Sequence, residues 1–243
     1  MLKIAFQSIP AGSFLMGATS DLFTNEQPQR RVSLTRSFEI SSCPVTQEQY
    51  RKVMKKSRNS VDQDWDPEPS HFDGDECPVD SVSWLDCVEF CRRLSERPES
   101  VSKGLVYRLP TEAEWEHACR ANTTTKFSFG DDDRELILHG WFEQNARGRT
   151  QTVGQLRANP WGLHDMHGNI WEWCSDWYAD YPHLEQDIDP EGPESGSLRS
   201  IRGGCWYLFP DYCRASSRYR YHDQFRSAHV GFRIVRSVRK VAL

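Results

Sequence analysis

The stretch GLHDMHGNIWEW, residues 162–173, is the most distinctive part of this chain, because two tryptophans flank a glutamate close to a Gly-Asn pair. Tryptophan is a large side chain that is highly buried on average and contributes strongly to cores and interfaces. The stretch therefore predicts either a functional site or a tightly packed turn. Two shorter motifs follow it, RGGCW at residues 202–206 and GFR at residues 231–233.

A fourth motif, RLPTEAEWE at residues 108–116, completes a set that resembles the formylglycine-generating enzyme family, also called the sulfatase-modifying-factor family. The motifs occur in the family's order, and the resemblance extends over nearly the whole chain. It implies one α+β domain over residues 1–243, with a C-type-lectin-like core, few regular elements and much irregular loop.

The composition indicates a water-soluble protein with a substantial core, since 37% of the 243 residues are hydrophobic and 27% are charged. No apolar run approaches the roughly eighteen residues of a membrane span, and the N-terminus lacks the apolar segment of a signal peptide. We therefore expect no membrane association and a cytoplasmic location. None of the eight cysteines forms a Cys-x-x-Cys pair, which argues against a structural zinc site.

Charge is divided unevenly along the chain. Residues 201–243 contain nine Lys or Arg and two Asp, a net charge of +7, so the first 200 residues carry −12 of the total of −5. Arginines alternate with aromatic residues in this segment, as in some nucleic-acid-binding surfaces. The alternative is that these arginines pair with acids from the first 200 residues. We favour pairing, because the chain is acidic overall, and expect a protein or peptide ligand rather than nucleic acid.

Local patterns predict a hairpin over residues 6–17, a strand over residues 32–40 and three helices in the first half of the chain. Each helix begins with a capping box, and the three boxes are Thr46 with Gln49, Ser83 with Asp86, and Thr111 with Glu114. After Ala121 the helical pattern ends, and turn-forming residues recur every few positions. The second half is therefore expected to be rich in loops.

A calcium site is predicted within residues 165–172, where hard oxygen donors lie on a turn-prone backbone. The family resemblance implies that the side chains of Asp165 and Glu172 and the carbonyls of Gly168 and Ile170 would bind the ion. It also implies a second site that involves Asn145, for which the remaining ligands have no match here. The alternative is that Asp165 and Asn169 cap a turn and Glu172 pairs with an arginine.

The family's catalytic pair of cysteines, which binds Cu(I) and oxidises a substrate cysteine with O₂, is incomplete in this chain. The resemblance places Cys213 at the second cysteine and Leu208 at the first, while Cys205 replaces the serine of the family's Arg-Gly-Gly-Ser motif. Cu(I) prefers thiolate ligands, and leucine offers none. Copper chemistry would therefore need Cys205 to join Cys213, and a binding role is favoured over the alternative of an O₂-dependent oxidoreductase.

Residues 202–236 are the candidate recognition segment. The same fold serves as the variable protein of diversity-generating retroelements, in which residues near the C-terminus are diversified on a fixed frame. Tyr, Ser, His and Asp, which suit adaptable binding surfaces, are frequent here. The candidate ligand-binding residues are Trp206, Tyr207, Leu208, Phe209, Asp211, Tyr212, Ser217, Tyr219, Tyr221, His222, Phe225, Ser227 and His229. A fixed ligand-binding surface and a diversified one both remain open from the sequence.

Overall fold

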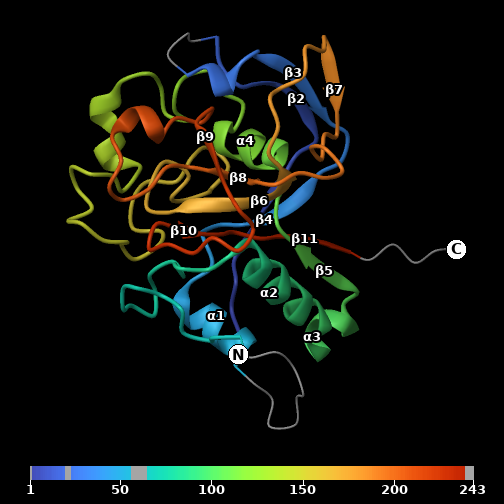
Figure 1. Ribbon diagram of the computed structural model, residues 1–243, viewed down its shortest axis with the longest axis vertical. Coiled ribbons are helices and arrows are strands. Elements are labelled where there is room, and N and C mark those ends of the chain that lie inside the picture. Colours follow the sequence, from blue (N-terminus) through green and yellow to red (C-terminus); the bar gives the residue numbers. More distant parts are fainter. Residues whose placement is uncertain (1, 20–22, 56–64, 239–243) are drawn as a thin grey trace, which may run out of the picture.

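The computed structural model describes residues 2–19, 23–55 and 65–238, and in this part of the chain three small sheets combine with four α-helices and extended loops (Figure 1). The α+β architecture predicted from the sequence is confirmed. Within the same residues, no helix combines the length and apolarity that a membrane crossing requires.

The sheets bring together strands from distant parts of the sequence. The first has the order β1-β4-β11-β5, all antiparallel, and is formed by β1 (Phe6–Ile9), β4 (Phe38–Ser41), β11 (Val235–Val238) and β5 (Leu105–Arg108). The second has the order β10-β6-β8-β9 and is formed by β10 (Val230–Gly231), β6 (Trp171–Trp177), β8 (Arg199–Arg202) and β9 (Arg218–Tyr221). The third has the order β2-β3-β7 and is formed by β2 (Gly12–Met16), β3 (Arg30–Leu34) and β7 (Gln186–Ile188).

The predicted helices form where their capping boxes begin. The four helices are α1 (Gln47–Met54), α2 (Trp84–Glu96), α3 (Pro98–Ser102) and α4 (Glu112–Arg120). All three predicted capping boxes are present, with both reciprocal hydrogen bonds in each. Local side-chain chemistry at a helix start is independent of tertiary packing, which is why these boundaries are readable from the sequence. After α4, the helical elements of the described residues are two short 3₁₀ turns, η2 (Asp133–Leu138) and η3 (Pro210–Tyr212), as expected for a loop-rich region.

Two strand predictions are wrong. β1 and β2 do not form a hairpin with each other, because β1 pairs with β4 and β2 pairs with β3. The linking residues Pro10 and Ala11 disfavour the positive φ that two-residue hairpin turns need, so the chain passes from one sheet to another instead. The single strand expected over residues 32–40 is divided into β3 and β4.

Two main hydrophobic clusters flank the second sheet. One packs α1 and α2 against residues such as Trp173 and Phe232, and the other packs α4 against β2, β3 and β4. In Figure 1, α1, α2 and α3 lie below β6, whereas α4, β2 and β3 lie above it. The tryptophans of the 162–173 stretch are in this centre, since Trp171 and Trp173 are both buried.

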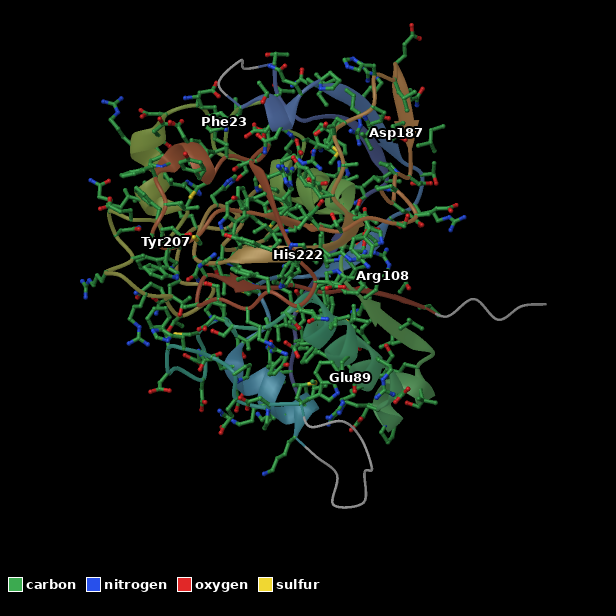
Figure 2. All side chains as sticks on the ribbon, viewed as in Figure 1. Phe23, Glu89, Arg108, Asp187, Tyr207 and His222 are labelled. Carbon is green, nitrogen blue, oxygen red and sulfur yellow. The ribbon has the colours of Figure 1, made fainter. Side chains whose placement is uncertain are left out.

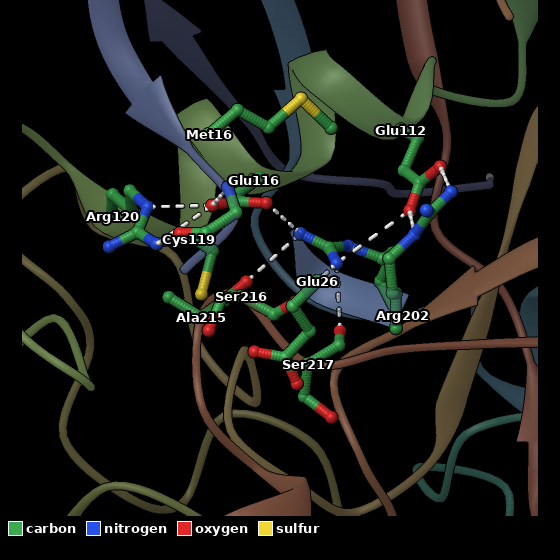
Figure 3. A network of polar contacts seen from close by, with 12 residues as sticks. Met16, Glu26, Glu112, Glu116, Cys119, Arg120, Arg202, Ala215, Ser216 and Ser217 are labelled. Atoms are coloured by element: carbon green, nitrogen blue, oxygen red, sulfur yellow. Dashed lines mark hydrogen bonds and ion pairs between the residues drawn. The ribbon is translucent and has the colours of Figure 1, made fainter. Parts of the chain in front are cut away.

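A lattice of buried arginine–carboxylate pairs holds the last third of the chain to the first two thirds (Figure 3). Arg202 donates to the carbonyls of Ala215, Ser216 and Ser217 at 2.8–3.0 Å and is ion-paired with Glu116. Arg218 makes two 2.7 Å hydrogen bonds to Glu112. The turn that leads into β9 is thereby fixed by α4, and this positions the segment that carries the candidate site.

Candidate functional site

Most arginines of the 202–236 segment are paired with acids, whereas Arg220 is exposed and forms no ion pair within the described residues. Arg214 donates to Glu26 at 2.7 and 2.8 Å, and Arg233 donates to Glu172 at 2.6 and 2.8 Å. Near the surface, Arg226 donates to Asp86 at 2.8 Å. The predicted pairing with acids from the first 200 residues is therefore confirmed for these arginines and for Arg218, but not for Arg220, whose guanidinium lies 4.4 Å from the Tyr178 ring.

Aromatic side chains of the same segment contact one another near the surface, and one of them, Tyr207, is labelled at the left of Figure 2. Tyr221 stacks on Phe225 with ring centroids 3.9 Å apart, and Tyr219 meets Tyr221 at 5.2 Å. Tyr207 meets His229 edge-on at 5.2 Å. We call this surface the aromatic face, and its members are Phe72, Trp206, Tyr207, Tyr219, Tyr221, Phe225 and His229.

The tryptophans of the 162–173 stretch support the aromatic face from behind. Trp171 lies 6.5 Å from Tyr219, and Trp173 lies 6.5 Å from Tyr221, between ring centroids. Both tryptophans are buried, whereas Tyr219 is 49% exposed. The face is therefore a single layer of rings on a rigid base, which keeps the conformational cost of binding low.

Hydrogen bonds fix the orientation of several rings. The Trp206 indole donates to the carbonyl of Ala228 at 3.0 Å. The His229 ring contacts the Ser227 hydroxyl at 2.7 Å through Nδ1 and the Tyr221 hydroxyl at 3.2 Å through Nε2. Burial lowers the pKa of His229, which favours the neutral imidazole. In the neutral ring, one nitrogen donates a hydrogen bond and the other accepts one.

The structure brings seven of the predicted ligand-binding residues together and separates the others. Trp206, Tyr207, Tyr219, Tyr221, Phe225, Ser227 and His229 lie on or directly beneath the aromatic face. Phe209, Asp211 and Tyr212 are exposed at the η3 turn, where Tyr212 meets Phe23 at 5.9 Å rather than the face. His222 is exposed and contacts the carbonyl of Ser197 at 3.0 Å.

Two predicted residues point inward, and one contributor was missed. Ser217 is 3% exposed, and its carbonyl accepts a hydrogen bond from Arg202. Leu208 is half-buried and packs against the main core cluster. Phe72 meets Trp206 at 5.5 Å and extends the aromatic face with a residue more than a hundred positions earlier in the chain. No motif surrounds Phe72, so only the folded chain reveals its role.

Gly203 and Gly204 turn the chain from the buried Arg202 toward the aromatic face. Both have positive φ, +103° and +75°, which glycine adopts without strain. A Cβ atom on Gly204 would come within 2.7 Å of the Cys213 sulfur and of the Tyr212 carbonyl oxygen. Only glycine fits here, because the turn presses the backbone directly against the Cys213 loop.

The two candidate catalytic cysteines are fully buried and uncharged. Cys205 packs in the main core cluster, whereas Cys213 packs with Phe127, Leu136 and Phe142. Burial raises the pKa of Cys213 to about 12 and raises that of Cys205 as well. Copper(I) binds thiolates, and this apolar environment disfavours them. The residues present therefore do not fit a copper site of the family's kind, and copper stays a prediction without structural support.

The predicted calcium ligands make contacts within the protein. Both oxygens of Glu172 accept from Arg233, and Oε2 also accepts from the Trp115 indole at 2.6 Å. Asp165 accepts from the Gly154 amide at 2.8 Å, and the Gly168 carbonyl accepts from the Ile170 amide at 2.8 Å. This arrangement matches the alternative reading of a capped turn with an arginine-paired Glu172.

The donor set therefore fits a calcium ion poorly, because Arg233 already neutralises Glu172. Asn145 caps its own turn, accepting from Phe142 and donating to Gly140. Within the described residues, no three side chains of His, Cys, Asp or Glu are grouped as a metal site. Calcium binding remains a prediction, and its test is given in the Discussion.

Sequence and structure comparisons identify relatives over most of the chain. The model of the sulfatase-modifying factor enzyme 1-like domain matches residues 5–238. The formylglycine-generating enzyme of Thermomonospora curvata is 34% identical over 175 residues, which cover 64% of this chain and 54% of that protein. The serine/threonine-protein kinase pkn1 of Chlamydia caviae is 29% identical over 253 residues, 95% of this chain but 38% of that protein. The chain thus spans only part of these longer proteins.

Two solved structures share the fold along almost their entire lengths. Treponema denticola variable protein 1 superposes with a TM-score of 0.81 at 29% identity, covering 95% of this chain and 94% of that chain. PvdO from Pseudomonas aeruginosa superposes with a TM-score of 0.81 at 28% identity, covering 95% and 93%.

Proposed function

We propose that this chain, which belongs to the sulfatase-modifying factor enzyme 1-like family, is a binding member of that family. The two positions of the family's catalytic cysteine pair are occupied here by Leu208 and Cys213, so only one of them is a cysteine. The ligand of this chain is a protein or peptide, and the aromatic face is the binding surface. The observation that carries this proposal is the cluster of contacting aromatic rings, with Tyr207 and Tyr219 exposed, that packs over buried tryptophans.

The chemistry of the face suits a protein ligand. Tyrosine and tryptophan provide large contact areas and have few rotatable bonds, so little conformational entropy is lost on binding. Tyr207 and Tyr219 are 40% and 49% exposed, which leaves part of each side chain accessible to a ligand. Arg218 and Arg226 are engaged in ion pairs, and Arg220 is the one exposed arginine of β9 that has no ion pair within the described residues, so the face carries little of the free positive charge that would favour a nucleic acid.

Similarity to Treponema denticola variable protein 1 supports the further proposal that the face is diversified. The motif residues Arg202–Gly204 and Gly231–Arg233 are buried, whereas most of the candidate contact residues of the segment are exposed or half-buried. Sequencing of this locus across a natural population tests the idea. Substitutions concentrated at Tyr207, Tyr219 and their exposed neighbours would support diversification, and an invariant segment would contradict it while leaving a fixed binding role intact.

A binding experiment tests the main proposal. Peptides selected from a random library on the immobilised protein would be measured by calorimetry against wild type, Tyr207→Ala and Tyr219→Ala. We expect each substitution to weaken binding roughly tenfold or more, as for aromatic residues at the centre of an interface. Val101→Ala, at a 63% exposed position on α3, is the control and should bind as wild type. Equal affinities of all four proteins would contradict the proposal.

The enzymatic alternative rests on Cys213 and on the similarity to formylglycine-generating enzymes. It predicts Cu(I) binding that depends on both Cys205 and Cys213, together with O₂ consumption when a cysteine-containing peptide is supplied. Cu(I) affinity unchanged in Cys213→Ala would count against it. The binding proposal makes neither prediction, so this assay separates the two functions.

A further inference from the structure

A second candidate site lies away from the aromatic face. It is a cavity of about 370 Å³ lined by β2, β3, the start of α4, the end of β6 and residues 179–193. Asp187, one of its lining residues, is labelled at the upper right of Figure 2, whereas Tyr207 is at the left edge. The volume is at the small end of the range for pockets that hold small molecules.

Arg30 is the notable residue of this cavity, because it is 7% exposed and only partly satisfied. Its Nη2 lies 3.5 Å from the Asp187 carboxylate, and its guanidinium lies 4.1 Å above the Tyr181 ring. Its Nε and Nη1 atoms have no hydrogen-bond partner among the described residues. Buried N–H groups normally have an acceptor, so a ligand oxygen that reaches Arg30 from the cavity would satisfy donors that the described residues leave unpaired.

The neighbouring cation differs from Arg30 in having its hydrogen bonds filled. Arg218 donates to both oxygens of Glu112 and to the carbonyls of Asn25 and Ala179. It lies 4.0 Å from the same Tyr181 ring. Arg218 and Tyr181 therefore hold the wall in place, and Arg30 is left as the donor for a ligand.

The rim of the cavity carries unpaired negative charge. Asp180 and Glu191 line the cavity, are exposed, and form no ion pair within the described part of the chain. Glu112 and Asp187, in contrast, have arginine partners. A second carboxylate would be repelled at such a rim, whereas an ammonium group would be attracted.

The remaining surface is apolar and includes Met16, Pro182 and Leu184. We propose that this cavity binds an α-amino amide, the chemistry of an amino-acid amide or of a peptide N-terminus. The amide carbonyl accepts from Arg30, the ammonium group lies toward Asp180 and Glu191, and an apolar side chain contacts Leu184. Asp176 is another lining residue, and burial raises its pKa to about 7. The negative charge on this buried carboxyl is thereby reduced, which leaves Asp180 and Glu191 at the rim as the partners of the ammonium group.

Four small probes test the proposal by calorimetry and thermal shift with the full chain at about pH 6.5, where an α-amino group is protonated. Leucinamide carries both required groups, 3-methylbutylamine lacks the amide and 4-methylpentanamide lacks the amine. We expect leucinamide to bind roughly tenfold more tightly than either truncated probe, since each leaves one polar partner unused. The tripeptide Leu-Gly-Gly separates the two sources, because tighter binding than leucinamide assigns a peptide N-terminus. No binding by any probe, or equal binding by all, would overturn the proposal.

Three variants place the binding in this cavity. Leu184→Trp, at a 50% exposed position, should block leucinamide binding and leave the melting temperature of the free protein unchanged. The combination Asp180→Asn with Glu191→Gln should weaken leucinamide but not 4-methylpentanamide. Arg30→Lys should reduce the advantage of leucinamide over 3-methylbutylamine. Undiminished leucinamide binding by Leu184→Trp would refute the location. The cavity shares no residue with the aromatic face, so the result is independent of the proposed function.

Discussion

Residues 202–236 contribute both to the arginine–carboxylate lattice, which is buried, and to the aromatic face, which lies at the surface. In β9, Arg218 is 3% exposed and pairs with Glu112, while the next residue, Tyr219, is 49% exposed. Successive strand residues point to opposite sides, so one short strand serves the interior and the surface at once. Stability and recognition are therefore assigned to different side chains of the same strand, and either can be changed with limited effect on the other.

The two regions also differ in what removal of one side chain leaves behind. Loss of one partner from a buried ion pair leaves an uncompensated charge, which costs several kcal/mol. Loss of an exposed ring leaves only water in its place. The predictions below test this difference.

The largest expected effect is that of Glu112→Ala in the lattice. Glu112 accepts two hydrogen bonds from Arg218 and one from Ser200, and it lies 3.7 Å from Arg202. Its removal should lower the free energy of unfolding by about 3–5 kcal/mol, measured by urea denaturation. Glu143→Ala, on an exposed side chain, is the control and should be neutral. A loss below about 1 kcal/mol for Glu112→Ala would show that the lattice contributes little to stability.

Asp176 provides a contrast inside the same buried region, since it accepts from the Glu112 amide and the Ser175 hydroxyl but has no arginine partner in the described residues. Burial, followed by repulsion from Glu112, raises the pKa of Asp176 to about 7, whereas the unfolded value is about 4. The folded state holds this proton more tightly, so the associated stability is fully present below about pH 4 and is lost as the pH rises through 7.

Asp176→Asn should remove this dependence. Relative to wild type, the variant should gain stability between about pH 4 and pH 8, by at most about 4 kcal/mol, the equivalent of three pKa units. Urea denaturation of both proteins across this range measures the difference, in which all other titrating groups cancel. A constant difference between the two proteins would show that Asp176 is ionised in the fold.

On the aromatic face, Tyr219→Ala should change the free energy of unfolding by no more than about 0.5 kcal/mol, as is usual for surface positions. Tyr221→Ala should cost more, because this half-buried ring stacks on Phe225 and touches Trp173. Thermal melts of the two variants therefore show how much the exposed ring and the half-buried ring of the face each contribute to stability. A large loss from Tyr219→Ala would place that ring in the core and remove it from the binding surface.

The smallest effect is expected from calcium. Since Arg233 pairs with Glu172, addition of Ca²⁺ should leave the melting temperature unchanged, because only a ligand that binds the native state stabilises it. Chelator-treated protein melted with and without Ca²⁺ provides the measurement. A rise in melting temperature that Asp165→Asn abolishes would restore the calcium site predicted from the sequence.

The parts of the fold that could be predicted from the sequence are those that depend on contacts between neighbouring residues. The helix starts at Thr46, Ser83 and Thr111 were predicted correctly because each capping box lies within four residues. The hairpin over residues 6–17 was wrong because the partners of its two strands come from elsewhere in the chain. Short strands alone do not reveal which distant strand they will meet.

The candidate site shows the same limit. Tyr207, Tyr219 and His229 were foreseen, since they lie between recognisable motifs. Ser217 was not separated from them, because the sequence does not show that the turn before β9 is buried and that Arg202 binds its backbone carbonyls. Phe72 was missed entirely, since its contact with Trp206 exists only after folding.

The turn at Gly203 and Gly204 has a practical consequence for anyone who would use this chain as a scaffold for laboratory evolution. Because Gly204 touches the Cys213 sulfur and the Tyr212 carbonyl so closely, library members with a side chain at this position would fail to fold. Randomisation that spares the glycine pair and the inward arginines, and begins at Tyr207, would place nearly all sequence variety in foldable clones.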